Sequence, residues 1–366
     1  MKIQAAVARK AGAALEIETL DIEAPRPTEV LVRVVATGVC HTDMVVRDGH
    51  LPTPMPVVLG HEGAGIVEAI GSDVRKVKVG DHVVMSFNSC GCCPSCRDDE
   101  PAYCHEFFPR NFFAAREDGT SGLSKGAEMI HGNFFGQSSF ATRALCHERN
   151  VVKVRDDVPL DILGPLGCGI LTGAGAVMNS LQVTAGKSFV VFGAGSVGLS
   201  AVMAAHAVGA AIIIAVDVNE ERLKFALSVG ATHAINPKTQ DAVARILEIT
   251  GAGANFSLDT TAIMAVVRQA VLCLAPRGAC GVLGAAPMGT ELQLDEVHFM
   301  SGGRRLIGIV EGSANPDTFI PKLIDLHAQG RFPFDRMVRF YPFDRINEAI
   351  ADSEQGRTIK PIVHME

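Results

Sequence analysis

Two different patterns of hydrophobic and polar residues divide the chain. In residues 1–150, short apolar runs such as 30–35 and 81–85 alternate with Gly and Pro turns. Short runs that are interrupted at frequent intervals are typical of strands in an antiparallel sheet. We therefore predict an antiparallel, barrel-like domain in the first part of the chain.

The pattern changes between about residues 185 and 310. There, apolar strand-like runs at 189–192 and 212–216 alternate with alanine-rich helical segments. Strands that alternate with helices indicate βαβ units around a parallel sheet. The last part of the chain adds a helical stretch at 319–329 and a strand at 359–364.

The order of these patterns indicates two domains, one inserted into the other. At 366 residues the chain is long enough for two cores, and hydrophobic residues make up 48% of it. We expect residues 1–169 and 312–366 to form the barrel-like domain. Residues 170–311 should form a doubly wound parallel-sheet domain, so the predicted class is α/β. No apolar run approaches the roughly 18 residues that a membrane-spanning helix needs.

Charge and cysteine content limit the cellular compartment and the kinds of partner that we expect for this protein. The net charge of −7 provides no basic field for nucleic acid. Residues 1–7 run into Arg9 and Lys10 without a continuous apolar core, so we expect no secretory signal. Ten cysteines in such a chain favour metal ligands or free thiols over disulfides. We expect a cytoplasmic protein that binds neither nucleic acid nor membranes.

A glycine-rich motif predicts a dinucleotide site. The G-x-G-x-x-G of residues 193–198 follows the strand at 189–192 and opens a helix. Its glycines allow a tight turn, close approach of the backbone to a pyrophosphate, and close helix–strand packing, while the helix N-terminus attracts the phosphates. The alternative is a purely structural turn. The expected cofactor contacts here are Gly193, Gly195, Ser196, Val197 and Gly198.

Asp217 lies about twenty residues beyond this motif, after the second strand. A carboxylate at this place accepts hydrogen bonds from the adenosine ribose hydroxyls and repels a 2′-phosphate. We therefore expect NAD rather than NADP; the alternative is a solvated turn residue.

A cysteine-rich lobe at about 90–104 predicts a structural zinc site. Its C-x2-C-x2-C-x7-C spacing suits tetrahedral Zn²⁺, and four thiolates leave no open position for chemistry. A disulfide cluster is the alternative, but such frameworks belong mostly to small secreted domains. Cys92 is the spare thiol. The predicted ligands are Cys90, Cys93, Cys96 and Cys104.

Three residues far apart in sequence predict a second zinc site. Cys40, His61 and Cys168 supply two thiolates and one imidazole, which leaves the fourth position of a catalytic zinc for water or substrate. A lone Cys is more commonly a small buried apolar residue, and a lone His a satisfied polar group. However, His61 lies in the tight bend 60–63 and Cys168 stands between two glycines.

Taken in order, these motifs resemble the zinc-dependent medium-chain alcohol dehydrogenases over essentially the whole chain. The resemblance implies a GroES-like antiparallel β-barrel catalytic domain, a Rossmann nucleotide domain, two zinc ions per chain and NAD. It also implies a homodimer or homotetramer joined through edge strands of the nucleotide domain. The motifs that carry it are Cys40–Asp43, Gly60–Glu62 with Gly65, the four-cysteine lobe, Gly167–Gly169 and Gly193–Gly198.

Within that family, the stretches 132–140 and 308–312 look most like aryl-alcohol (benzyl-alcohol) dehydrogenases. This resemblance implies reversible oxidation of primary aromatic alcohols to aldehydes by hydride transfer to NAD. An aliphatic alcohol dehydrogenase and a glutathione-dependent formaldehyde dehydrogenase are the alternatives within the class. Outside it, a non-catalytic dinucleotide-binding protein, either a redox sensor or a lens-type protein, would need the open zinc site to be missing.

The resemblance also assigns roles near the catalytic zinc. Thr42 supplies the hydroxyl that takes the alcohol proton, Asp43 hydrogen-bonds the zinc ligand His61, and the neighbouring Glu62 resembles a carboxylate that can approach the metal. His41 stands where the family often has Arg facing the pyrophosphate.

Three further expectations follow from the resemblance. Lys360 should reach the same phosphates as His41. Many relatives have a histidine three residues after the hydroxyl residue, which ends the proton relay at solvent; here that place holds Val45, and His50 is a candidate substitute. An apolar lining for the cleft, or else ordinary core packing, is expected of Phe87, Phe112, Phe113 and Phe134.

Overall fold

The computed structural model describes residues 1–365, and the chain divides into two compact units. The barrel unit contains Met1–Gly169, Asn315–Ile324 and the segment from Asp335 onward, and the nucleotide unit contains Ile170–Ala314 and Asp325–Phe334. The first division falls where the sequence places it. The second falls after residue 314 rather than 311, and residues 325–334 cluster with the nucleotide unit instead of the barrel unit.

The nucleotide unit is built on a six-stranded parallel sheet with the order β13-β12-β11-β14-β15-β16. The strand order reverses between β11 and β14, the switch point at which doubly wound sheets bind nucleotides. The strands are β11 (Ser188–Phe192), β12 (Ile212–Val216), β13 (His233–Ile235), β14 (Ala254–Asp259), β15 (Leu274–Val282) and β16 (Arg305–Gly308). The predicted Rossmann architecture is confirmed.

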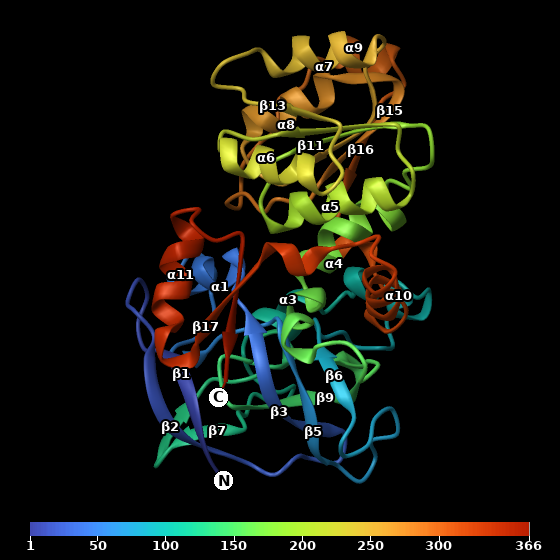
Figure 1. The fold of residues 1–366 in the computed structure, drawn as a ribbon. Helices are drawn as coiled ribbons and strands as arrows, with labels where there is room; N and C mark the ends of the chain where they lie inside the picture. Colours follow the sequence, from blue (N-terminus) through green and yellow to red (C-terminus); the bar gives the residue numbers. More distant parts are fainter. Residues whose placement is uncertain (366) are drawn as a thin grey trace. The chain divides into compact units, whose positions relative to one another are not determined.

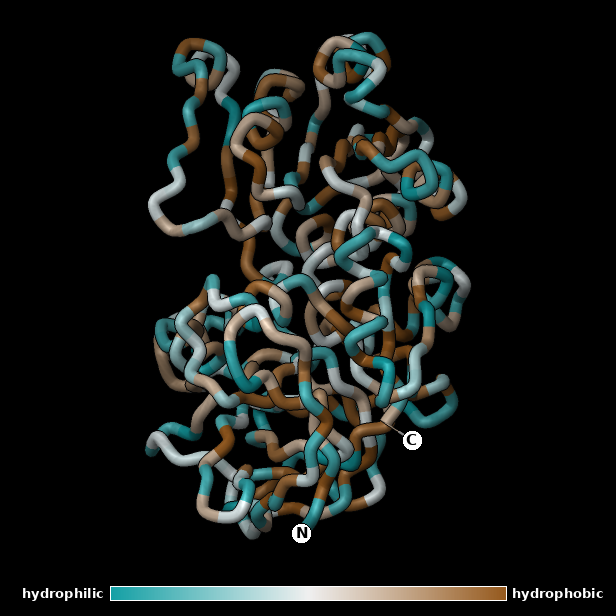
Figure 2. Tube along the Cα trace, turned by 90° about the vertical axis from the view of Figure 1, so that its left-hand side faces the viewer, coloured by the Kyte–Doolittle hydropathy of each residue, from teal (hydrophilic) through white to brown (hydrophobic). Residues whose placement is uncertain are grey.

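Helices cover both faces of this sheet, with α5 on one side and α7 on the other (Figure 1). The helices in this part of the chain are α4 (Gly169–Gly175), α5 (Ser196–Ala207), α6 (Glu220–Ser228), α7 (Ala242–Thr250), α8 (Met264–Leu272) and α9 (Glu296–Ser301). Because both faces are covered, the central strands are apolar almost throughout, and Val190, Phe192 and Ile214 are buried in the core. Figure 2 shows hydrophobic segments within this unit, whereas its outer loops carry both hydrophilic and hydrophobic residues.

The barrel unit contains two sheets, a five-stranded one with the order β4-β1-β2-β7-β8 and a seven-stranded one with the order β10-β6-β5-β3-β18-β17, in which β9 also pairs with β3. The strands are β1 (Lys2–Ala8), β2 (Glu16–Ile22), β3 (Glu29–Gly38), β4 (Val57–Val58), β5 (Gly63–Ile70), β6 (His82–Met85), β7 (Leu123–Lys125), β8 (Glu128–Ile130), β9 (Arg143–His147), β10 (Val151–Lys153), β17 (Val338–Pro342) and β18 (Lys360–His364). Within the described residues every named pair of strands is antiparallel except β17–β18.

The long strand β3 curls the second sheet. Its register with β5 shifts twice, between Leu31 and Val32 and between Val34 and Ala36. Such bulges bend a strand and increase its twist. As a result β3 pairs with β9 along its first half and with β18 at its end. The prediction of an antiparallel, barrel-like domain is confirmed.

Short helices complete the barrel unit: α1 (His41–Arg47), α2 (Pro94–Arg97), α3 (Phe107–Phe112) and α11 (Ile346–Glu354). Helix α10 (Pro316–Ala328), predicted at 319–329, contains the boundary between the units. None of the helices in residues 1–365 combines the length and apolar composition needed to cross a membrane.

Candidate zinc sites and nucleotide site

Cys40, His61 and Cys168 converge in the barrel unit. Their ligand atoms all lie within 4.8 Å of one another. Cys40 precedes α1, His61 lies in the bend before β5, and Cys168 immediately precedes α4. Two thiols and one imidazole in such a group suit a catalytic zinc with one open position.

The imidazole of His61 is oriented for a metal. Its Nδ1 lies 2.9 Å from Asp43 Oδ1, and its Nε2 is buried without a hydrogen-bond partner among the described residues. The acceptor Asp43 fixes the proton on Nδ1, so the lone pair of Nε2 faces the two thiols. An unpartnered buried nitrogen costs about 1–3 kcal/mol, and zinc coordination removes that cost. The site therefore fits the metal.

Asp43 also holds the backbone around the trio. Its Oδ2 accepts a hydrogen bond from Cys40 N, and its Oδ1 accepts one from Gly60 N, both at 3.0 Å. A single buried carboxylate thus joins the first ligand, the bend and the ring of the second ligand.

The third ligand is placed by close backbone packing. A Cβ on Gly164 would lie 2.2 Å from Glu62 O, and one on Gly167 would lie 2.1 Å from Met85 O. Both positions therefore require glycine. The loop that carries Cys168 can approach the His61 bend only because these side chains are absent.

The electrostatics of the trio favour a thiolate. A hydrogen bond with Cys168 lowers the pKa of Cys40 well below its ordinary value; burial opposes this effect, and the charge of His61 adds to it. Thiolate is the form in which cysteine binds zinc.

Lys360 lies beside the zinc ligands. Its side chain is buried, and Nζ lies 2.9 and 2.8 Å from the two carboxylate oxygens of Glu62 and 3.2 Å from Val39 O. Burial alone would lower the pKa of Lys360, but the charge of Glu62 outweighs it and raises that pKa. The ammonium is thus held at the carboxylate beside the zinc ligands, and its contact with the cofactor phosphates stays a prediction.

The residues predicted for the proton relay and the phosphate contact lie in helix α1 or just after it. Thr42 is half-buried, with Oγ1 3.8 Å from Cys40 Sγ, and His41 is exposed. Val45 is half-buried, and the backbone N–H of the exposed His50 donates to Val45 O at 3.0 Å. The structure therefore puts the Thr42 hydroxyl beside a zinc ligand.

Phenylalanines enclose the ring of His61. Phe135 stacks on it with centroids 4.5 Å apart, and Phe134 meets its edge at 5.5 Å. Phe112 lies 5.0 Å from the Phe135 ring, and Phe107 lies 6.4 Å from it. The zinc site thus has an aromatic wall.

The predicted aromatic residues differ in exposure. Phe87 and Phe134 are buried and Phe112 is half-buried, whereas Phe113 is 47% exposed. Their role as a cleft lining stays a prediction. Phe135, which makes the closest ring contact with His61, was overlooked because no local signal separates it from its neighbour.

The cysteine lobe forms a second group of four thiols, Cys90, Cys93, Cys96 and Cys104, with Sγ atoms within 4.8 Å of one another. The Cys90 and Cys96 sulfurs are 3.9 Å apart. Tetrahedral zinc with Zn–S bonds of roughly 2.3 Å separates its sulfurs by about 3.8 Å. The group therefore fits a closed zinc site.

Backbone donors support a thiolate at Cys90 in this lobe. Burial opposes ionisation, but the N–H groups of Cys92 and Cys93 lower the pKa of Cys90 to about 6. Cys92 itself is exposed and outside the group of four. All ten cysteines are free thiols, so the disulfide alternative has no support.

The phosphate loop has the geometry that its glycines predict. Gly193 has φ of +95°, and a Cβ there would lie 2.3 Å from Thr260 Oγ1; at Gly198 it would lie 1.8 Å from Gly193 O. At Gly195, by contrast, a Cβ would meet nothing within 4 Å. The loop therefore packs closely on one side and leaves open space at the N-terminus of α5, which is where a pyrophosphate binds.

Asp217 lies directly against this loop. Its Oδ2 accepts a hydrogen bond from Ala194 N at 2.6 Å, and its Oδ1 accepts one from Asn219 N at 2.8 Å. Ser196 and Val197 form the first turn of α5. The carboxylate at the end of β12 and the loop at the end of β11 are thus held together, as a dinucleotide site requires.

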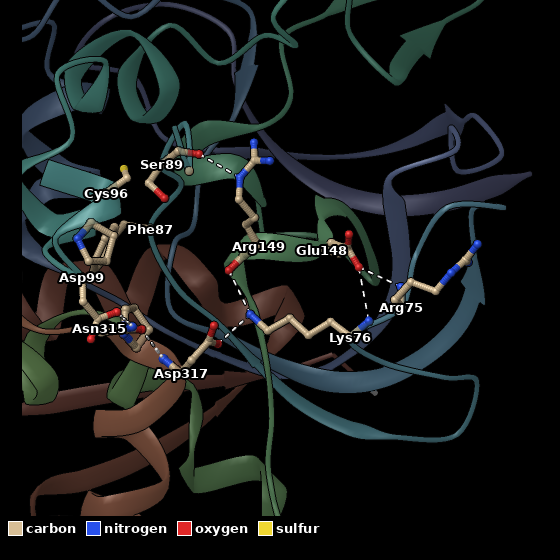
Figure 3. A pocket seen from close by; sticks show the side chains of 13 residues that line it. Arg75, Lys76, Phe87, Ser89, Cys96, Asp99, Glu148, Arg149, Asn315 and Asp317 are labelled. Carbon is tan, nitrogen blue, oxygen red and sulfur yellow. Dashed lines mark hydrogen bonds and ion pairs between the residues drawn. The ribbon is translucent and has the colours of Figure 1, made fainter. Parts of the chain in front are cut away.

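A hollow of about 480 Å³ in the barrel unit is not the reaction site (Figure 3). One structural zinc ligand, Cys96, lines it, but none of the catalytic trio does. Its polar groups bind one another: Lys76 binds Asp317 and Arg149 O, Glu148 accepts from the amides of Arg75 and Lys76, Arg149 donates to Ser89 O, and Asn315 donates to Asp99.

Comparisons with known proteins agree with this arrangement. The profile of the alcohol dehydrogenase GroES-like domain matches residues 26–156, and that of the zinc-binding dehydrogenases matches residues 196–329. A geraniol dehydrogenase of Castellaniella defragrans is 48% identical over 98% of this chain and 97% of its own.

Two solved structures are also similar. An alcohol dehydrogenase zinc-binding domain protein from Burkholderia ambifaria is 54% identical, with a TM-score of 0.99 over 100% of this chain and 99% of its own. A benzyl alcohol dehydrogenase from Acinetobacter calcoaceticus is 52% identical, with a TM-score of 0.98 over 100% of both chains. This chain therefore belongs to the zinc-dependent medium-chain alcohol dehydrogenases, which use zinc and NAD to interconvert small alcohols and aldehydes.

Proposed function

We propose that this enzyme reversibly oxidises primary aromatic alcohols of the benzyl type to aldehydes. The observation that carries the proposal is the aromatic wall on His61, where Phe135 stacks at 4.5 Å and Phe134 lies edge-on at 5.5 Å. A flat aromatic substrate gains about 0.5–1.5 kcal/mol from each such ring contact beyond its burial. The similarity to a benzyl alcohol dehydrogenase supports this choice.

Each residue around the zinc site in the barrel unit has its own role in the proposed reaction. Zinc held by Cys40, His61 and Cys168 supplies Lewis-acid polarisation of the substrate oxygen, and NAD supplies the hydride acceptor. Asp43 keeps the imidazole in the tautomer that the metal needs. Thr42, beside Cys40, accepts the proton that leaves the alcohol. The surrounding phenylalanines exclude water from the reacting atoms.

We propose NAD as the working cofactor because of Asp217. Its carboxylate lies at the loop that receives the pyrophosphate, where it can accept bonds from the ribose hydroxyls and repel a 2′-phosphate. Glu62 is the carboxylate that assists exchange of the fourth zinc ligand, and His41 takes the place of an arginine toward the phosphates.

A flat allylic primary alcohol is the second candidate. The similarity to a geraniol dehydrogenase favours it, and an apolar aromatic wall accepts an allylic π-system as well as an aryl ring. An aliphatic alcohol or hydroxymethylglutathione makes no use of ring stacking.

A kinetic panel tests these proposals. Benzyl alcohol, substituted benzyl alcohols, geraniol, ethanol and hydroxymethylglutathione are compared by kcat/KM with NAD and with NADP. The benzyl alcohols should give the highest values. Equal or higher values for ethanol or hydroxymethylglutathione contradict the proposal, and a preference for geraniol selects the allylic alternative.

We propose that the chain forms a homodimer or homotetramer through β16. This strand lies at the sheet edge, and Leu306 and Val310 are 36% and 38% exposed. An exposed edge strand favours pairing with another chain. Light scattering should show a mass of two or four chains.

We propose that the protein works in the cytoplasm, because its ten free thiols favour a reducing compartment.

A further inference from the structure

The bend between β4 and β5 carries two side chains that point to different partners. His61 faces the thiols of the trio and Asp43, whereas Glu62 faces Lys360 and accepts a bond from Gly169 N at 3.1 Å. The bend consists of residues 60–63, of which 60–62 lie outside regular secondary structure and Gly63 begins β5. Their backbone groups need partners from elsewhere in the fold.

One buried side chain satisfies the backbone on both sides of Glu62. Gln137 Nε2 donates to His61 O at 2.9 Å, and Gln137 Oε1 accepts from Gly63 N at 3.1 Å. The second Nε2 proton goes to Ser86 O at 3.3 Å. A primary amide offers a donor and an acceptor at this spacing at any pH, and here each is used.

Gln137 is itself held firmly. It is 1% exposed, and it lies in a turn where Asn133, Phe135 and Ser138 adopt φ values of +68°, +50° and +52°. Such conformations cost about 1–3 kcal/mol each and persist only where the surroundings enforce them. Ser138 Oγ donates to Val58 O at 2.6 Å, so the turn is tied to the strand before the bend.

We infer that Gln137 is a positioning residue of the catalytic zinc site. Its amide clamps the peptide groups that flank Glu62 and so fixes the direction in which the His61 ring leaves the backbone. The same turn presses the Phe135 ring against the zinc ligand. Gln137 acts through His61 rather than on substrate, so this role is independent of which alcohol the enzyme oxidises.

Replacement of the amide tests this role through the metal itself. Gln137→Met keeps the side-chain length but removes the donor and the acceptor. Partners that orient a metal ligand are typically worth 10–100-fold in metal affinity. We expect one zinc per chain to pass to a chelator about 10–100-fold faster, with the other zinc unchanged. With cobalt exchanged into the catalytic site, the d–d absorption bands should shift.

Asn111→Leu is the matched control. Asn111 is a buried amide that binds Asn88 N, Asn88 O and Phe107 O, and none of these hydrogen bonds goes to the bend at 60–63. It should lower the melting temperature without changing zinc release or the cobalt bands. Unchanged release and bands in Gln137→Met, or equally fast release in Asn111→Leu, would overturn the inference. If Gln137→Met does not fold, Gln137→Glu carries both readouts, measured at a pH at which its carboxyl is ionised and so keeps only the acceptor for Gly63 N.

Discussion

Lys360 Nζ lies 2.8 Å from Glu62 Oε2, and both side chains are almost completely excluded from solvent. An ion pair at this depth is kept together by the cost of leaving either charge alone. Removing one partner of a buried pair costs about 3–5 kcal/mol, whereas replacing both by neutral groups can cost little.

Lys360→Met should therefore lower the free energy of unfolding by about 3–5 kcal/mol, and the double variant Lys360→Met/Glu62→Gln should recover much of this loss. Urea unfolding measures both. Lys2→Met breaks the exposed pair with Asp21 and should cost at most about 1 kcal/mol. Equal losses in Lys360→Met and Lys2→Met would show that the buried pair is not energetically coupled.

The two zinc sites should differ in lability. The lobe of four thiols is closed, whereas the trio Cys40, His61 and Cys168 has one open position for exchange. Mild chelation should abolish activity while circular dichroism stays unchanged, and only stronger chelation should unfold the protein. Elemental analysis should give two zinc ions per chain, and fully active enzyme with one or none would disprove this prediction.

Most parts of the site that could be predicted from sequence are local or follow a fixed motif; the distant trio Cys40, His61 and Cys168 could be predicted because two of its members stand in tight glycine-flanked bends and the set resembles a family pattern. Cys90 to Cys104 have ligand spacing within a short stretch, and Gly193 follows a strand and opens a helix. In each case the signal lies in neighbouring residues of the chain.

The parts that could not be predicted depend on strand pairing. Lys360 meets Glu62 across 298 positions because β18 pairs with β3, and Gln137 meets Gly63 across 74 positions. A buried lysine and a surface lysine look alike in sequence. The assignment of residues 325–334 to the nucleotide unit could not be predicted either. Helix α10 is continuous, and its sequence gives no signal that its two ends belong to different units.

Asp217 should determine cofactor choice. Asp217→Ser removes the charge that binds the ribose and repels a 2′-phosphate, and a lost charge-assisted bond costs about 1.5–3 kcal/mol, or roughly ten- to hundred-fold in NAD affinity. Because Asp217 also holds Ala194 N, Asp217→Asn is the informative companion: it can keep that bond while losing the charge. Unchanged kcat/KM for NAD and NADP in both variants would refute the role.

Thr42 should carry the proton away from the alcohol. Its Oγ1 lies 3.8 Å from the zinc ligand Cys40, and it is not itself a ligand. Thr42→Ala should lower kcat by roughly 10²–10⁴-fold, the usual span for losing a positioned proton acceptor. Zinc content and NAD binding should change little, because neither depends on this hydroxyl.

Thr42→Ser is the decisive companion, since it keeps the hydroxyl and should keep most of the activity at saturating substrate. The side chain of Val45 cannot pass a proton on to solvent, and the exposed His50 donates its backbone N–H to Val45 O. Val45→His would supply the missing end and should raise turnover near neutral pH, where loss of the proton limits the rate. If Thr42→Ala and Thr42→Ser turn over equally fast, the proton leaves by a path that does not include Thr42. A histidine at position 45 would then bring no gain, because the relay that it completes would not exist.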